Sequence, residues 1–301
     1  MTMRPVRKSS TSQPTLEGAG VHLRRAFGFA GTEEFDPFLL LDDFRNDRPE
    51  DYLAGFPWHP HRGIETVTYV LAGTVAHGDS LGNRGVIGAG GVQWMTAGSG
   101  IIHQEMPEGD EQGRMHGFQL WLNLPREHKM TPPRYQDVHG PDVPEVGEDD
   151  GTVARVICGS LWGATGPVDG IAGEPTYVDV RVPAGVTRRI PVAHGRHAFA
   201  YVFEGDGTFA DASGPLAVPT ESADGSRIVP PDVRDRSLVL FDAGDEVVVR
   251  AGEQGLRFLL VSGRPFREPV AWHGPIVMNT EGELRRAYRE LQDGTFLRHA
   301  G

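Results

Sequence analysis

Two pairs of potential metal ligands lie in the first half of the chain. His59 and His61 are separated by one residue, and His103 and Glu105 have the same i, i+2 spacing. Side chains two positions apart on a β-strand point to the same face of the sheet. If the two pairs lie on neighbouring strands, three imidazoles and one carboxylate can converge on a single cation.

The ligand types restrict the chemistry of such a site. A set of nitrogen and oxygen donors without a thiolate argues against a structural zinc site. Octahedral sites with N/O ligands and open positions suit redox-active first-row metals, iron(II) first among them. Four protein ligands would leave two positions for water, substrate or dioxygen. The sequence therefore predicts a mononuclear catalytic or sensory metal site.

The residues between the two pairs have the pattern of a β-sheet. Residues 66–70 alternate between threonine and apolar or aromatic side chains, and glycines recur between residues 73 and 91 at expected turns. A single His-x-His pair is more often a surface or hydrogen-bonded pair than a ligand pair. The second pair, on a separate expected strand, makes the metal site the preferred interpretation.

These motifs resemble those of the pirin family in the cupin superfamily. The resemblance rests on residues 36–42, 59–73, 92–107, 119–125 and 268–280, which include His59-Pro60-His61-Arg62-Gly63 and His103-Gln104-Glu105-Met106-Pro107. It covers nearly the whole chain and is closest to quercetinase-like bacterial pirins. It implies an all-β fold, the double-stranded β-helix, in a bicupin arrangement of two tandem cupin barrels with a short C-terminal helix.

The resemblance also implies the ligand set. The pirin motif, carried over position by position, gives His59, His61, His103 and Glu105 as metal ligands. The general cupin pattern would instead take its carboxylate from the first motif, where Glu65 lies. We expect Glu105 to be the ligand, and Glu65 to lie beside the ligands or in the barrel wall.

Two functions from different classes follow from the resemblance. The first is a quercetin 2,3-dioxygenase-like enzyme that opens a flavonol ring with dioxygen and releases carbon monoxide, with Glu105 as general base for the substrate hydroxyl. The second is a redox-sensing iron protein that binds a transcription factor or a metabolic enzyme.

The ligands and partners expected for the enzyme are one divalent metal, a small planar phenol and dioxygen. Iron(II) is the first choice of metal, and nickel, cobalt, manganese, copper and zinc accept similar ligands. Candidate apolar residues for packing a flat substrate are Phe56, Trp94, Met95 and Met106. The roles of His77 and His116 stay open between structural and site-related ones.

The chain reads as two domains. The proline-rich and acidic stretch 126–150 reads as a linker, so we expect a metal-binding cupin barrel over 1–140 and a second barrel over 141–301. The second half holds no counterpart of the four ligands in the equivalent motifs, so we expect no second metal site. The polar stretch 206–235 is expected to be a surface loop, and Thr280 and Glu283 predict a capping box at the start of a helix ending near Leu291.

Composition and charge restrict the ligands and the cellular compartment expected for the protein. The formal charge of -12 disfavours direct binding to nucleic acid or to anionic membranes, which requires a cationic surface. The single cysteine, Cys158, excludes an intrachain disulfide, and the chain has no apolar stretch of the ~20 residues that a membrane span requires. We therefore expect a cytoplasmic protein that is a monomer by default and that can bind a protein partner.

Overall fold

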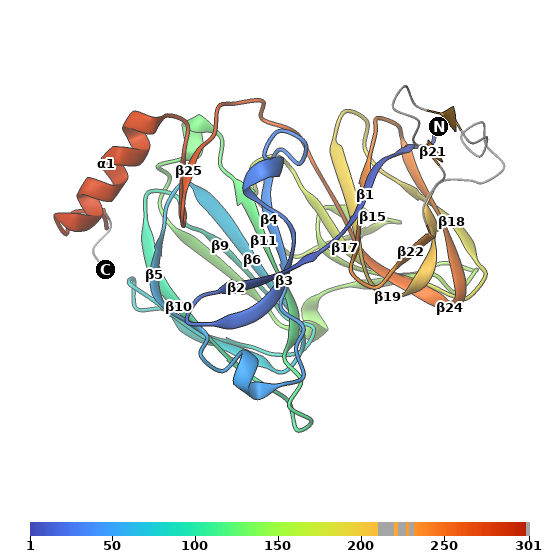
Figure 1. Ribbon diagram of the computed structural model, residues 1–301, viewed down its shortest axis with the longest axis horizontal. Coiled ribbons are helices and arrows are strands. Elements are labelled where there is room, and N and C mark those ends of the chain that lie inside the picture. The colour runs from blue at the N-terminus through green and yellow to red at the C-terminus, as the bar shows by residue number, and fades with distance from the viewer. Residues whose placement is uncertain (210–219, 222–226, 229–231, 299–301) are drawn as a thin grey trace. The chain divides into compact units, whose positions relative to one another are not determined.

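The computed structural model describes residues 1–209, 220–221, 227–228 and 232–298, most of which lie in β-strands (Figure 1). By its internal contacts the chain forms two compact units. One contains Met1–Ser12 and Pro144–Pro265, and the other contains Gln13–Val143 and Phe266–Gly301. The boundary between Val143 and Pro144 lies close to the expected boundary at residue 140. The two chain ends differ from the expectation, because each packs with the unit formed mainly by the other half of the sequence. The family domains 1–140 and 141–301 stay a prediction.

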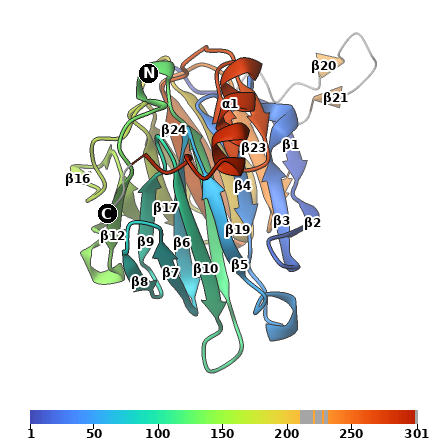
Figure 2. The ribbon, with the colours of Figure 1, turned by 90° about the vertical axis from the view of Figure 1, so that its left-hand side faces the viewer.

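Two antiparallel sheets make up most of the unit that contains the candidate ligands. The larger has the strand order β12-β9-β6-β11-β4-β3-β2, and the smaller has the order β5-β10-β7-β8, in which β5, β10 and β7 lie side by side (Figure 2). The strands of the larger sheet are β2 Gln13–Glu17, β3 Val21–Phe27, β4 Phe38–Asp43, β6 Ile64–Ala72, β9 Val92–Thr96, β11 His116–Asn123 and β12 Arg134–Val138. Those of the smaller are β5 Phe56–His61, β7 Thr74–Asp79, β8 Arg84–Ile87 and β10 Ile101–Glu108.

Strand β6 lies near the middle of the larger sheet and is buried along most of its length. Its β-branched and aromatic residues suit a central strand. The alternation places Thr66 and Thr68 on one face and Val67 and Tyr69 on the other. The threonine face is the one that reaches the site described below.

The C-terminal segment packs against the β5–β6 region. Strands β25 Ala271–His273 and β26 Ile276–Met278 form a pair, and helix α1 Glu281–Gln292 follows them. The expected capping box is present: the Thr280 side chain accepts a hydrogen bond from the Glu283 backbone N–H, and the Glu283 carboxylate accepts one from the Thr280 backbone N–H. Gly63 has a positive φ of 75°, and an added Cβ would collide with the Val277 carbonyl oxygen. A glycine is therefore required where this segment passes.

The other unit is also antiparallel. Its main sheet has the order β1-β23-β19-β24-β17-β14-β13, with β18 on β24 and β22 on β19. The strands are β1 Val6–Thr11, β13 Glu145–Gly147, β14 Val153–Cys158, β17 Thr176–Val182, β18 Thr187–Pro191, β19 His197–Phe209, β22 Asp232–Arg234, β23 Ser237–Phe241 and β24 Glu246–Gly263, with the short pairs β15 Ser160–Leu161 and β16 Ala164–Thr165, and β20 Thr220–Glu221 and β21 Arg227–Ile228. Because β1 pairs with β23, the N-terminal residues belong to this unit.

The expected all-β fold with a short C-terminal helix is confirmed. Most of the predicted surface loop 206–235 lies outside the described residues. Within the part of the chain that is described, no helix is long and apolar enough to cross a membrane.

Candidate metal centre

Strands β5 and β10 bring the predicted ligands together. The two strands pair antiparallel, with His103 opposite His59 and Ile101 opposite His61. Directly opposed residues share a face of the sheet, as do residues two apart. His59, His61 and His103 therefore project to the same side.

The three imidazoles form a compact cluster. One potential ligand atom from each lies within 4.8 Å of the others, and the ring centroids are 4.4–5.0 Å apart. Two ligands at about 2.1 Å from a common cation lie about 3–4 Å apart, so small side-chain rotations bring the three nitrogens to that spacing. Among the described residues this is the cluster of histidine, cysteine and carboxylate side chains that can hold a metal ion.

The hydrogen bonds of the rings leave nitrogen lone pairs for a metal. His59 Nδ1 lies 2.8 Å from the Pro57 carbonyl oxygen, and His61 Nδ1 lies 3.2 Å from that of Pro275. A carbonyl oxygen only accepts hydrogen bonds, so both Nδ1 atoms carry the proton and both Nε2 atoms hold a lone pair. Neither buried ring nitrogen of His103 has a hydrogen-bond partner among the described residues. A metal ion would bind one ring nitrogen of each histidine, including one of the two unpartnered nitrogens of His103.

Burial favours the neutral form of two of the three imidazoles, those of His61 and His103. Burial lowers the pKa of His61 well below its usual value, and the neighbouring His59 lowers it further. The pKa of His103 is likewise lowered, by burial first and then by the other imidazoles. Neutral imidazole is the form that binds metals, so the site favours it before any metal arrives.

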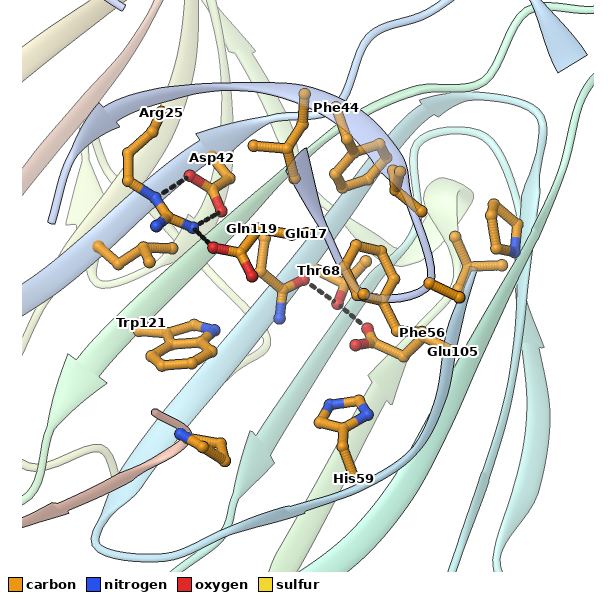
Figure 3. A pocket seen from close by; sticks show the side chains of 18 of the residues that line it. Glu17, Arg25, Asp42, Phe44, Phe56, His59, Thr68, Glu105, Gln119 and Trp121 are labelled. Carbon is orange, nitrogen blue, oxygen red and sulfur yellow. Dashed lines mark hydrogen bonds and ion pairs between the residues drawn. The ribbon is translucent and has the colours of Figure 1, made fainter. Parts of the chain in front are cut away.

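Glu105 lies beside the histidine cluster. A β-bulge separates it from His103, and its Oε2 is 3.9 Å from His103 Nε2. Its Oε1 accepts a hydrogen bond of 2.8 Å from the Thr68 hydroxyl, which is also 2.7 Å from Gln119 Oε1 (Figure 3). The Thr68 bond orients one carboxylate oxygen and leaves Oε2 directed to the histidine side.

The site opens into a cavity of about 470 Å³. This volume lies in the range of about 300–1,000 Å³ that is common for small-molecule sites. The wall includes His59, His61 and Glu105, the aromatic side chains Phe29, Phe44, Tyr52, Phe56, Trp121 and Trp272, and the polar side chains Glu17, Arg25, Asp42, Thr68 and Gln119. The walls are therefore mainly apolar and aromatic, with a few polar groups.

Of the four predicted substrate-packing residues, Phe56 lines this cavity, and Trp94, Met95 and Met106 are not among its lining residues. Trp94 pairs with Val67, on the face of β6 opposite to Thr68. Met95 packs in the cluster of Ile64, Ala97 and Ile101. Met106 follows Glu105 on β10, so its side chain points to the opposite face.

Glu65 lies away from the ligand cluster. It alternates with Thr66 and Thr68, so it occupies the other face of β6, where its Oε1 accepts a hydrogen bond of 2.8 Å from Thr96. Burial raises its pKa to about 7, and the Thr96 bond offsets part of that rise.

His77 and His116 have different surroundings. His77 is buried opposite Glu105 in the β7–β10 pairing, with Nε2 at 3.4 Å from Asp137 Oδ2. His116 is partly exposed, and its Nε2 is 2.6 Å from Asp47 Oδ1. Thus His77 neighbours the candidate centre, whereas His116 forms a separate hydrogen-bonded pair with Asp47.

The cavity wall also contains residues that the sequence motifs do not mark as metal ligands or substrate contacts. Thr68, Gln119 and Asp42 occupy paired positions on β6, β11 and β4, because Gln119 lies opposite both Thr68 and Asp42. The alternation of β6 and β11 was visible in the sequence, but which face turns inward was not. Trp272 and Pro275 come from the distant C-terminal segment, and no local pattern signals their place in the wall.

Comparison with known protein sequences shows which family the chain belongs to. The Pirin family model matches residues 20–122, and the model for the pirin C-terminal cupin domain matches residues 177–297. A pirin-like protein of Caulobacter vibrioides is 46% identical over 297 residues, covering 98% of this chain and 100% of that protein. A Pseudomonas aeruginosa protein provisionally named quercetin 2,3-dioxygenase is 42% identical, covering 97% of each chain.

The fold has a close counterpart among solved structures. The crystal structure of quercetin 2,3-dioxygenase from Acinetobacter baumannii superposes with a TM-score of 0.85 at 29% identity, covering 98% of each chain. Two domain models match the two halves of the chain, and the Caulobacter relative matches it along its full length. This chain is a member of the pirin family, with two cupin-like domains.

Proposed function

We propose that this protein is a metal-dependent dioxygenase that opens the ring of flavonols such as quercetin and releases carbon monoxide. The observation that carries the proposal is the cluster of three histidines, two of which (His59 and His61) line a cavity of about 470 Å³ together with Glu105 and several aromatic side chains. The names of the Pseudomonas and Acinetobacter relatives support this reaction class.

The residues proposed to hold the metal are His59, His61, His103 and Glu105. Three imidazoles and one carboxylate fit iron(II), our first choice, and also fit nickel, cobalt, manganese, copper or zinc. When bound, the metal supplies a Lewis acid for the substrate oxygen and a coordination site for dioxygen.

The protein side chains bind the substrate and hold its proton. Glu105 Oε2, which the Thr68 bond leaves available, is the proposed acceptor of the proton from the reacting hydroxyl. Phe44, Phe56 and Trp121 provide apolar surfaces for a flat ring system. Since most of the wall is apolar, bound substrate would displace water from around the reacting oxygen.

The direct test is anaerobic reconstitution with iron(II), followed by addition of quercetin and air. Flavonol absorbance and carbon monoxide release are measured together. We expect turnover by the unmodified protein and a loss of about 10²-fold or more in His103→Ala and Glu105→Ala. Stoichiometric metal binding with no consumption of flavonol would overturn the dioxygenase assignment.

A second candidate function is redox-dependent binding of a transcription factor or a metabolic enzyme. It is favoured by Trp58, which lies between Pro57 and His59 on the ligand-bearing strand β5 and is 54% exposed. A change at the centre would reach this surface aromatic residue through one strand. The test compares how much partner protein is captured by the iron(II) form, by the iron(III) form and by the Trp58→Ala variant. Equal capture by these three samples would exclude this function.

A further inference from the structure

A charged cluster lies in the cavity wall away from the histidines. Arg25 Nε and Nη2 donate to Asp42 Oδ1 and Oδ2 at 2.8 and 2.7 Å, and Glu17 Oε1 is 2.8 Å from Arg25 Nη2 (Figure 3). All three side chains line the same cavity as His59 and Glu105. We call Glu17, Arg25 and Asp42 the distal cluster.

Strand pairing gives the distance between the two polar regions. Thr68, Gln119, Asp42 and Arg25 are successive cross-strand neighbours on β6, β11, β4 and β3. Neighbouring strands lie about 4.8 Å apart, so Asp42 is about 10 Å from Thr68, whose hydroxyl contacts Glu105. A ligand that reaches the distal cluster from the histidines must therefore span several fused or linked rings.

The charges of the distal cluster determine what it can bind. Two carboxylates and one guanidinium sum to a charge of about -1. Arg25 uses its Nε and Nη2 donors on the carboxylates, whereas each carboxylate keeps further lone pairs. Burial raises the pKa of Asp42 to about 6, so an added donor would relieve its poor solvation. The net negative charge and the remaining carboxylate lone pairs favour O–H and N–H donors over anionic groups.

A second carboxylate–guanidinium pair, formed by the next residue of β4, allows a structural role of Asp42 to be distinguished from a role in binding substrate. Asp43 accepts from Arg45 Nε at 2.8 Å and from Nη2 at 2.6 Å, and it is as buried as Asp42. Neither Asp43 nor Arg45 lines the cavity. Asp43 can therefore serve as a matched control: it forms the same kind of ion pair as Asp42 but does not face the cavity.

We propose that Glu17, Arg25 and Asp42 form a specificity subsite that accepts hydrogen bonds from phenolic hydroxyls at the end of the substrate remote from the histidines. This inference rests on the proposed function, because it assumes that the reacting hydroxyl of the same molecule lies at Glu105. It defines the substrate class as polyphenols with free distal hydroxyls. Their methylated, sulfated or carboxylated forms should bind poorly.

The test measures equilibrium binding to the iron(II)-loaded protein in the absence of dioxygen, with tryptophan fluorescence as the signal. The ligands are quercetin and 3-hydroxyflavone, which keeps the reacting end and lacks the distal hydroxyls. We expect quercetin to bind about tenfold or more tightly in the unmodified protein, since a hydrogen bond to a charged group contributes at least this factor. The affinity ratio is the Kd of 3-hydroxyflavone divided by the Kd of quercetin. Asp42→Asn and Glu17→Gln should each lower this ratio at least about threefold.

Asp43→Asn should leave the ratio unchanged. Glu17 is 41% exposed, so Glu17→Gln decides the question if Asp42→Asn does not fold. The proposal is overturned by a ratio near one in the unmodified protein, by equal ratios in all variants, or by no binding of either compound. Turnover in air is measured separately: an Asp42-dependent preference without ring cleavage would refute the dioxygenase while leaving the subsite intact.

Discussion

At the scale of single residues, one hydroxyl proton has two candidate acceptors. Thr68 lies within hydrogen-bond distance of both Glu105 Oε1 and Gln119 Oε1, but it can donate only once. If Glu105 is ionised, Thr68 donates to it, and Gln119 must turn its amide nitrogen towards the Thr68 oxygen. The resulting chain of hydrogen bonds from Gln119 through Thr68 holds the carboxylate in place.

Removal of that hydroxyl should weaken metal binding. Thr68→Val keeps the shape of the side chain but releases Glu105, so we expect metal affinity to fall about 10–100-fold, as for other groups that orient metal ligands. Competition with a chelator measures it. Thr66→Val, on the same face of the same strand, is the control. Unchanged affinity in Thr68→Val would argue against Glu105 as a ligand.

Glu65 gives a prediction about pH and stability. Its pKa is about 7 in the folded protein because of burial, against an ordinary value of 4.5. Between these values the folded state holds a proton that the unfolded state has released. The free energy of unfolding should therefore be highest below pH 4.5 for this group and fall as the pH rises through 7, by up to about 3 kcal/mol.

Denaturant unfolding at a series of pH values measures this slope. Glu65→Gln mimics the protonated side chain, so it should flatten the curve between pH 5 and about 8 and leave the protein at least as stable at the upper end. An equal slope in the variant and the unmodified protein would show that Glu65 is not the group responsible.

At the scale of elements, the C-terminal segment supports the ligand-bearing strand. The Pro275 carbonyl orients His61, and the adjacent Arg62 donates to Ser99 O, Glu290 Oε2 and Phe296 O, each at 2.7 Å. Arg62 is fully buried, and its guanidinium lies 4.1 Å from the centroid of the Phe296 ring. Residues from the far end of the chain therefore hold the β5–β6 turn in place.

Breaking this network should affect both stability and the metal. Arg62→Ala leaves buried acceptors without their donor, so we expect a loss of about 3–5 kcal/mol in the free energy of unfolding and weaker metal binding through His61. Arg298→Ala removes an exposed partner of Glu290 and should change stability by about 0.5 kcal/mol or less. Similar losses in the two variants would contradict this role for Arg62.

At the scale of the whole molecule, the two units differ in chemistry although both are antiparallel β. In the described part of the chain, the cluster able to hold a metal lies in the unit of Gln13–Val143 and Phe266–Gly301. In the other unit, His194 is exposed and pairs with Asp245 at 3.1 Å. We therefore expect one metal per chain.

Metal loading should also stabilise the protein. At a free metal concentration of about 100 times Kd, binding adds about 2.7 kcal/mol to the free energy of unfolding. Metal analysis and thermal unfolding check both expectations. His103→Ala should lose the bound metal and the rise in unfolding temperature on metal addition, whereas His194→Ala should keep both. Two metals per chain, or a shift that persists in His103→Ala, would contradict the assignment.

The sequence by itself determined the features that depend on neighbouring residues. The i, i+2 spacing of His59 with His61 was enough to predict a shared strand face, and Thr280 with Glu283 predicted the helix start. These features follow from the period of a strand and from the hydrogen bonds of a helix terminus, so they need no knowledge of distant contacts.

Only the tertiary structure decided which strand faces turn towards the cavity. Alternation divides β6 and β9 into two faces but does not say which one is inside, so Trp94 was an expected cavity residue and Thr68 was not. The same limit applies to Pro275 and Asp42, whose contacts join residues far apart in the chain. Such contacts depend on strand order and register, which the packing of the whole unit selects.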